Sequence, residues 1–162
     1  MPLIHSVLVE AAARWLETTR GCSLVLTEFT CAGCETPDAI GWRISEGWSV
    51  LVECKVSRSD FRRDQLKPSR SNEEMRVGQE RWYLTPPGLL RPAEMPEDWG
   101  LLEAGAKIRV ALRCPAAPEV GRYVGRGPLD TNIQARELHF LLSVYRRKLC
   151  SKCARVMYKG AD

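Results

Sequence analysis

The chain has 162 residues, of which 44% are hydrophobic and 27% are charged, and it carries a net charge of +4. This composition supports a buried core, and we expect a single domain over residues 1–162. No apolar run approaches the roughly 18 residues that span a bilayer, and the first twenty residues lack the basic start of a signal peptide. We therefore expect a cytoplasmic protein with no membrane partner.

The apolar spacing predicts the elements in chain order. A helical stripe from Ile4 to Trp15 indicates a first helix, which ends near Gly21. Strands are expected at 22–30, 39–44 and 49–56, with a hairpin turn at 45–48. A short helix at 57–66, a polar loop at 68–80, a strand at 81–85 and a strand pair within 101–114 complete an α/β core.

A C-terminal helical extension is expected over about residues 130–153. Its apolar side chains recur at helical spacing and predict the face that packs on the core. These side chains are Ala135, Leu138, Leu141, Leu142, Tyr145 and Leu149.

Two charged residues stand in an otherwise apolar strand. Glu53 and Lys55 are two residues apart, so both project from one face of the strand. Asp38 precedes the neighbouring strand of the same hairpin, so its carboxylate can approach that of Glu53. Adjacent carboxylates repel each other unless a cation neutralises them, and Mg²⁺ prefers oxygen ligands. The pattern predicts a Mg²⁺ or Mn²⁺ site suited to phosphodiester hydrolysis; the alternative is a solvated face.

These residues also resemble a known motif. Pro37–Asp38 followed by Glu53-Cys54-Lys55 is similar to the motif of the PD-(D/E)XK nuclease superfamily. The order of helix, three-strand meander, helix and strand over about residues 3–112 resembles that superfamily's restriction-endonuclease-like core. The stretches at 54–67 and 81–90 resemble a bacterial and phage-borne branch close to the MmcB-related DNA-repair proteins. The implied fold is an α/β core with a mixed central sheet flanked by helices and an added C-terminal helix.

The resemblance implies a metal-dependent DNA nuclease that acts through a metal-activated water. Asp38 and Glu53 would bind Mg²⁺ or Mn²⁺ together with the backbone carbonyl of Cys54, and Lys55 would serve the water. Glu10, on the first helix, would be an additional catalytic glutamate. DNA would be the partner, and because many relatives act as dimers, a homodimer stays open.

Other residues compete for the role of Glu10. Glu28 lies on the first strand and Glu17 lies on the first helix, so either is an alternative acid for the site.

Basic and polar residues follow the predicted site closely in sequence. They would attract a polyanion, with binding that weakens as salt increases. The DNA-binding candidates are Ser57, Arg58, Arg62, Arg63, Lys67 and Arg70. For the nearby Asp60 and Asp64, helix capping and a solvated helix face are the favoured interpretation.

The seven cysteines include two C-x₂-C pairs, Cys31 with Cys34 and Cys150 with Cys153. Two such pairs can close a tetrahedral Zn²⁺ site, which would be structural here; the alternative is reduced thiols without a metal. A different function is also open, because a nuclease fold can bind nucleic acid or a protein without cutting. The sequence thus leaves a non-catalytic binding module, with or without zinc, as the rival hypothesis.

Overall fold

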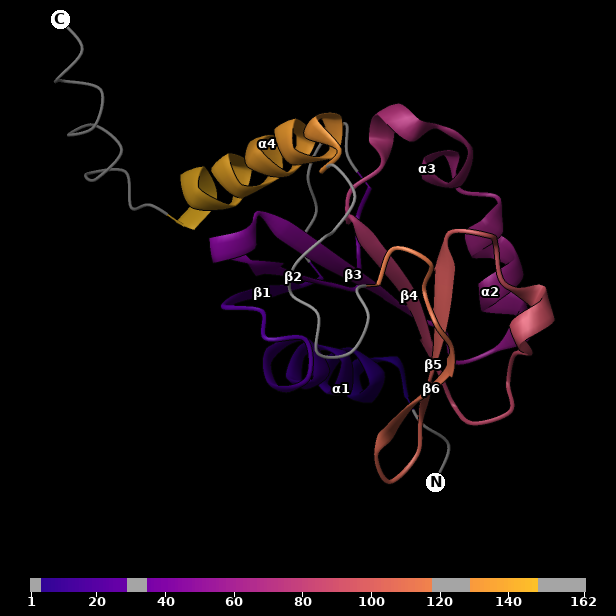
Figure 1. The fold of residues 1–162 in the computed structure, drawn as a ribbon. Coiled ribbons are helices and arrows are strands. Elements are labelled where there is room, and N and C mark those ends of the chain that lie inside the picture. The colour runs from indigo at the N-terminus through magenta and orange to yellow at the C-terminus, as the bar shows by residue number, and fades with distance from the viewer. Residues whose placement is uncertain (1–3, 29–34, 118–128, 149–162) are drawn as a thin grey trace, which may run out of the picture.

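The structure is a computed structural model that describes residues 4–28, 35–117 and 129–148. These residues form a six-stranded mixed sheet flanked by helices, which confirms the predicted α/β class (Figure 1). The helices are α1 (His5–Thr18), α2 (Arg58–Gln65), α3 (Pro68–Ser71) and α4 (Thr131–Lys148). The strands are β1 (Leu24–Thr27), β2 (Ala39–Arg43), β3 (Trp48–Cys54), β4 (Glu80–Thr85), β5 (Trp99–Ala104) and β6 (Ile108–Leu112).

The strands lie in the order in which they occur in the chain. β1, β2 and β3 form an antiparallel meander, β3, β4 and β5 are parallel, and β6 returns antiparallel to β5. The carboxyl ends of the three parallel strands therefore meet at one edge of the sheet. In open α/β sheets this edge is where ligand sites commonly form.

α1 covers one face of the sheet. Its buried side chains recur at helical spacing and pack against Val50, Val52 and Cys54 of β3. Those helix residues are Leu8, Val9, Ala12, Trp15 and Leu16. Gly21 takes a left-handed φ of +67°, as expected of a residue that ends a helix.

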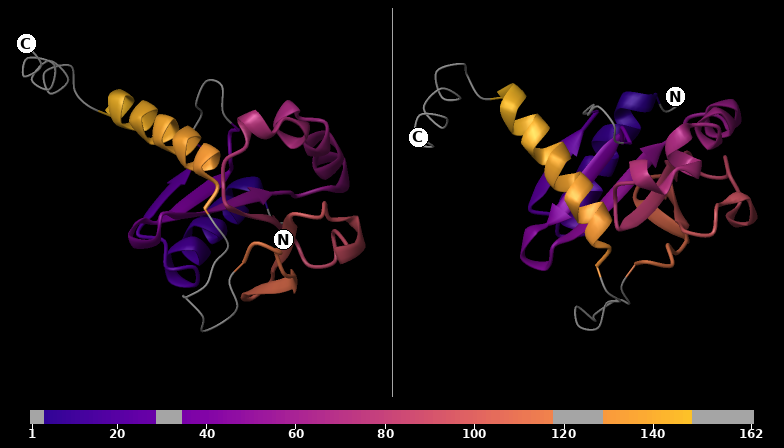
Figure 2. Two further views of the ribbon diagram at one scale, coloured as in Figure 1. Left: turned by 45° about the horizontal axis from the view of Figure 1, so that its top comes forward. Right: turned by 90° about the horizontal axis from the view of Figure 1, so that it is seen from above.

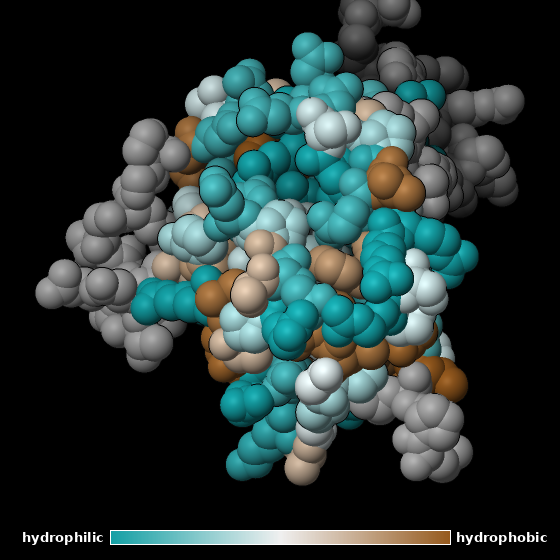
Figure 3. Space-filling model, turned by 90° about the vertical axis from the view of Figure 1, so that its right-hand side faces the viewer, coloured by the Kyte–Doolittle hydropathy of each residue, from teal (hydrophilic) through white to brown (hydrophobic). Residues whose placement is uncertain are grey.

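α2, α3 and α4 lie on the other face (Figure 2). There Phe61 of α2 and Phe140 of α4 join a core with Leu51 of β3, Tyr83 of β4 and Trp99 of β5. Seen from the side of α2 and α3, the surface is largely hydrophilic (Figure 3). Side chains alternate along β3, so Leu51 and Glu53 belong to this second face.

The hairpin between β2 and β3 turns through Gly47, which takes a left-handed φ of +62°. A short 3₁₀ turn (Ile44–Glu46) precedes it, within the region where the sequence predicts a turn. Trp48 belongs to β3 and is buried, with its indole N–H donating to Glu80 at 3.3 Å.

The polar stretch at 68–80, predicted to be an aperiodic loop, contains two short helical segments. Pro68 opens α3, where its fixed φ suits the first helical turn. Asn72 then accepts a hydrogen bond from the backbone N–H of Glu74 and caps a 3₁₀ turn (Glu73–Met75). The loop prediction was therefore wrong for this part, because Pro and Asn supply local start signals that an apolar-periodicity search does not detect.

The predicted packing face of α4 was also wrong for most of its residues. Among the described side chains of α4, those of Ile133, Glu137 and Phe140 are buried and that of Leu141 packs against the core that contains Phe140, whereas Leu138 and Leu142 are more than half exposed. Leu149 lies outside the described residues. Within the described residues, no helix is long and apolar enough to cross a bilayer.

The hydrogen bonds of Glu137 explain why this face of α4, and not the apolar face predicted from the sequence, is the buried one. Its carboxylate accepts from the Trp42 indole at 3.0 Å, the Ser49 hydroxyl at 2.5 Å and the Gly78 backbone N–H at 2.8 Å. A buried carboxylate needs such partners, because an unpaired one costs far more than an exposed leucine. The polar contacts thus decide which face of α4 is buried.

We expect Glu137→Ala to lower the free energy of unfolding by about 3 kcal/mol, because three donors lose their acceptor in a buried place. Urea denaturation of the purified protein measures this. Gln134→Ala on the same helix is the matched control, with one hydrogen bond to the Gly47 carbonyl at 3.2 Å, and should cost less than about 1 kcal/mol. Equal losses in the two variants would contradict the role given to Glu137.

Candidate active site

Asp38, Glu53 and Lys55 meet at the carboxyl edge of the parallel strands. Because Ala39 of β2 pairs with Val52 of β3, Asp38 comes opposite Glu53 in the antiparallel register. The Lys55 ammonium lies 2.9 Å from Glu53 Oε2 and 3.8 Å from Asp38 Oδ2. The backbone N–H of Cys54 donates to Asp38 Oδ2 at 2.7 Å, which fixes this carboxylate beside the strand end.

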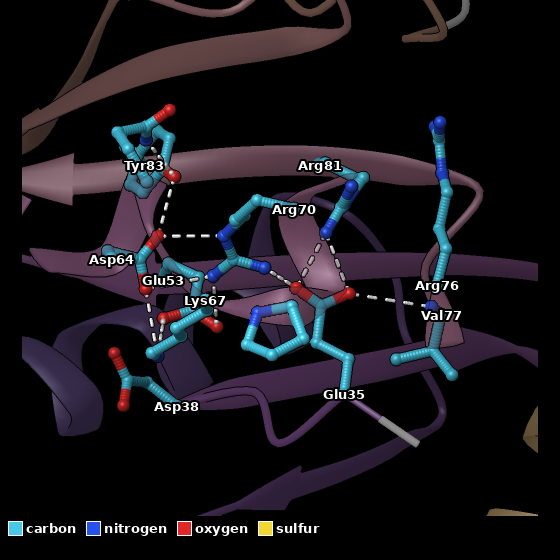
Figure 4. A network of polar contacts seen from close by, with 12 residues as sticks. Glu35, Asp38, Glu53, Asp64, Lys67, Arg70, Arg76, Val77, Arg81 and Tyr83 are labelled. Carbon is cyan, nitrogen blue, oxygen red and sulfur yellow. Dashed lines mark hydrogen bonds and ion pairs between the residues drawn. The ribbon is translucent and has the colours of Figure 1, made fainter. Parts of the chain in front are cut away.

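α2, the turn after it and α3 bring three more charged side chains to this point. Asp64 Oδ1 lies 3.2 Å from the Lys55 ammonium and 2.8 Å from that of Lys67. Arg70 binds Asp64 with two nitrogens, at 2.8 and 2.9 Å, and its Nη2 lies 3.1 Å from Glu53 Oε1 (Figure 4). We call these six residues the inner cluster: Asp38, Glu53, Asp64, Lys55, Lys67 and Arg70.

Glu53 is the most deeply placed acid of the inner cluster. Its side chain is fully buried, and burial raises its pKa to about 7, against the opposing effect of Lys55. Glu53 Oε1 is buried and accepts no well-aligned hydrogen bond, although Arg70 lies within ion-pair distance. A buried carboxylate oxygen without a hydrogen bond is the kind of donor atom that a cation can take.

Both lysines of the inner cluster stay protonated at neutral pH. Burial alone would lower the pKa of Lys55, but Glu53, Asp64 and Asp38 outweigh it and raise the pKa above its usual value. The pKa of Lys67 is raised in the same way by Glu53 and Asp64, against the effect of burial. Lys55 is therefore placed to donate hydrogen bonds and to stabilise negative charge, not to accept a proton.

A second pair of charges extends the network away from Asp38. Glu35 accepts from Arg81 Nη2 at 2.6 and 2.7 Å and contacts Arg70 Nη1. Figure 4 shows Arg70 between Asp64 and Glu35. The Arg70 and Arg81 guanidinium groups lie 4.9 and 4.2 Å from the centre of the Trp99 ring, which holds both by cation–π contact.

α1 contributes a histidine to the site instead of the expected glutamate. His5 Nε2 lies 3.3 Å from Asp38 Oδ1, whereas Glu10 is exposed on α1. Glu17 and Glu28, the alternative acids, are also exposed. The structure brings none of these three glutamates into the inner cluster.

The six DNA-binding candidates occupy different environments. Ser57 caps α2 by accepting from the backbone N–H of Asp60 at 3.2 Å, and Arg58 pairs with Glu94 and donates to the Leu89 carbonyl. Arg62 and Arg63 are exposed on α2. Lys67 and Arg70 are in the inner cluster, and Arg70 is only 5% exposed. Its side chain is thus inside the ion-pair network, whereas Arg62 and Arg63 face the solvent.

The two predicted metal sites differ in whether their residues belong to the described part of the chain. Within residues 4–28, 35–117 and 129–148, no group of three or more His, Cys, Asp or Glu side chains is spaced to hold a metal ion as it stands. The zinc candidates lie outside the described residues: Cys31, Cys34, Cys150 and Cys153. Cys54 is buried, and burial raises the pKa of its thiol, so it is a packing residue apart from its backbone.

A hollow of about 370 Å³ opens beside the network. Arg70, Arg81 and Trp99 line it, and Glu73, Glu97 and Asp98 line it as well. Asp98 pairs with Arg76 at 3.0 Å, so the acids of the rim offset the arginines.

Sequence reasoning missed two acids of this site. Asp64 was interpreted as a solvated helix residue, but it is buried and accepts from the Tyr83 hydroxyl at 2.7 Å. Glu35 was not considered, although it is buried between two arginines. The available signal for Asp64 was its spacing of three from Phe61, which puts both on the buried face of α2.

The chain was compared with known proteins. No family model and no curated protein matches it. A solved structure, the SPO1766 protein of unknown function from Silicibacter pomeroyi, is similar, with a TM-score of 0.59 and 22% identity. The match covers 91% of this chain and 88% of that one. At this identity the likeness shows the fold alone.

We expect Arg70→Ala to destabilise the protein by about 3 to 5 kcal/mol, because Asp64 and Glu53 then lose a buried partner. Arg63→Ala removes the same charge from the exposed face of α2 and should change the free energy of unfolding by less than about 0.5 kcal/mol. Urea titrations of both variants test this. If both variants change the free energy of unfolding by the same amount, the ion pairs of Arg70 do not stabilise the fold.

The raised pKa of Glu53 has a consequence for stability in the absence of divalent ions. The native state holds the Glu53 proton up to about pH 7, whereas the unfolded chain releases it near the ordinary value of 4.5. The contribution of Glu53 is therefore lost as the pH rises from 4.5 to 7, by on the order of 3 kcal/mol. Glu53→Gln should remove this loss, so the variant gains stability over the wild type between pH 5 and pH 8 in urea titrations with chelator. A difference in the free energy of unfolding between Glu53→Gln and the wild type that does not change with pH would contradict the raised pKa of Glu53.

Proposed function

We propose that this protein is a Mg²⁺- or Mn²⁺-dependent DNA nuclease of the PD-(D/E)XK type, with a restriction-endonuclease-like core. The reaction would be hydrolysis of a phosphodiester bond. The helix, three-strand meander, helix and strand order of α1 to β4 agrees with that core. The motif residues Asp38, Glu53 and Lys55 would form its active site.

One observation carries this proposal. Three carboxylates, those of Asp38, Glu53 and Asp64, approach the same Lys55 ammonium, at 3.8, 2.9 and 3.2 Å. Buried acids gather in this way only where a cation compensates them. A purely structural strand would place apolar side chains here at lower cost.

The donor atoms are of the kind that a hard divalent cation prefers, although the described side chains are not spaced to hold one as they stand. Asp38 and Glu53 supply carboxylate oxygens, one of which is buried without a hydrogen bond, and Asp64 supplies a third carboxylate nearby. When bound, such an ion supplies a Lewis acid and a more acidic water. Lys55 would hold the attacking water and stabilise charge on the phosphate, since its raised pKa keeps it protonated.

The surroundings suit a polyanionic substrate. Arg62 and Arg63 are exposed on α2, next to the inner cluster, and this side of the molecule is largely hydrophilic (Figure 3). Phosphate contacts from these side chains would make DNA binding fall as salt increases.

A non-catalytic binding module on the same fold is the second candidate. It is favoured by the neutral state of the inner cluster, in which three carboxylates already meet three cations. Calorimetric titration of Mn²⁺ separates the two functions. Binding that weakens in Asp38→Asn supports the nuclease, whereas no binding, or binding unchanged by that substitution, supports the module.

We expect Glu53→Gln and Lys55→Met each to lower the rate of DNA cleavage by about 10²- to 10³-fold, because the first removes a ligand of the metal ion and the second removes the charge that holds the water and faces the phosphate. Labelled single- and double-stranded DNA, incubated with Mg²⁺ or Mn²⁺ and resolved on gels, gives the rates. Glu17→Gln is the control, since Glu17 is exposed on α1, and should cleave as the wild type does. Cleavage at the wild-type rate in Glu53→Gln or Lys55→Met would remove that residue from the mechanism.

A further inference from the structure

The ammonium of Lys67 occupies the place in the inner cluster that an added cation would take. Its ammonium lies 2.8 Å from Asp64 Oδ1 and 3.8 Å from Glu53 Oε2. It therefore touches one acid of the predicted metal pair and the carboxylate that sequence reasoning missed. An ammonium held by two carboxylates has a positive charge and carboxylate oxygen neighbours, as a metal ion bound there would have.

Lys67 differs from the other cations of the inner cluster in its freedom to leave. Its side chain is 47% exposed, whereas those of Lys55 and Arg70 are 4% and 5% exposed. Arg70 is further held by Trp99 and Glu35. Lys67 precedes Pro68 in the turn between α2 and α3, so its flexible side chain can swing outward while the helices stay in place.

The net charge of the inner cluster favours release of the Lys67 side chain when a divalent ion binds. The inner cluster is neutral when its three carboxylates and three cations are all ionised. A divalent ion would leave it with an excess of two positive charges in a buried place, which is costly. Release of Lys67 to solvent halves that excess, and a phosphodiester group of the substrate cancels the remainder.

We propose that Lys67 is a displaceable internal counter-ion, which holds Glu53 and Asp64 until a divalent cation replaces its ammonium. The released side chain then reaches the DNA backbone, so metal binding and DNA binding favour each other. This inference rests on the proposed function and adds a positioning role for Lys67 and Asp64. Its ligand is the divalent cation itself.

The test is calorimetric titration of Mn²⁺ into the full chain without DNA. Lys67→Met should bind Mn²⁺ about tenfold more tightly than the wild type, because the ion no longer displaces an ammonium. Lys67→Arg, which keeps the charge, should bind no more tightly than the wild type. Lys107→Met is the matched control, because it removes the same charge from an exposed residue in the turn between β5 and β6, and its affinity should not change.

A second readout is thermal unfolding with and without Mn²⁺. Lys67→Met leaves Asp64 and Glu53 short of a cation, so it should melt lower than the wild type in chelator and gain more from added Mn²⁺. Unchanged or weaker Mn²⁺ affinity in Lys67→Met, or equal gains in Lys67→Met and Lys107→Met, would overturn the inference, as would a lack of binding in every variant. Loss of affinity in Asp38→Asn together with no effect of Lys67→Met would retain the proposed nuclease site and reject the counter-ion.

Discussion

The burial of the Glu53 carboxylate is the constraint on which the site depends. β3 is covered by helices on both sides, so an acid near its end has no access to water. Such a group persists only if cations surround it, and they come from three places: Lys55 directly follows β3, Lys67 lies in the turn between α2 and α3, and Arg70 lies on α3. The docking of α2 and α3 on the sheet is thus coupled to the electrostatics of one side chain.

The buried carboxylates of Glu80 and Glu137 are also held by several hydrogen-bond donors, but their partners differ from those of Glu53. Glu80 of β4 accepts from Arg20 and from the indoles of Trp48 and Trp82 on the α1 face. Glu137 binds neutral donors and fixes α4. Neither gathers other acids, as Glu53 does with Asp38 and Asp64. The difference separates single carboxylates that join elements from a group of carboxylates that lie around one ammonium, that of Lys55.

Much of the fold follows from local patterns, whereas only part of the site does. Alternation along β3 and the hairpin register bring Glu53, Lys55 and Asp38 together, because both are short-range properties of the chain. The spacing of Asp64 from Phe61 predicts that Asp64 is buried, but its partners and those of Glu35 depend on how α2 and the residues just before β2 pack, which spacing alone does not encode. The face of α4 was mispredicted for a related reason: its apolar residues allow more than one face, and the hydrogen bonds of Glu137, to residues far away in sequence, select one.

The position of Trp99 gives the protein an internal optical reporter. Its ring lies against Arg70 and stacks on Tyr83 at 4.2 Å, and both of these side chains bind Asp64. Indole emission responds to nearby charge, so any rearrangement of Arg70 changes the fluorescence of Trp99 without an attached dye. Comparison with Trp99→Phe isolates this signal from the other four tryptophans. A rearrangement of Arg70 can therefore be followed in solution, in real time and at low protein concentration.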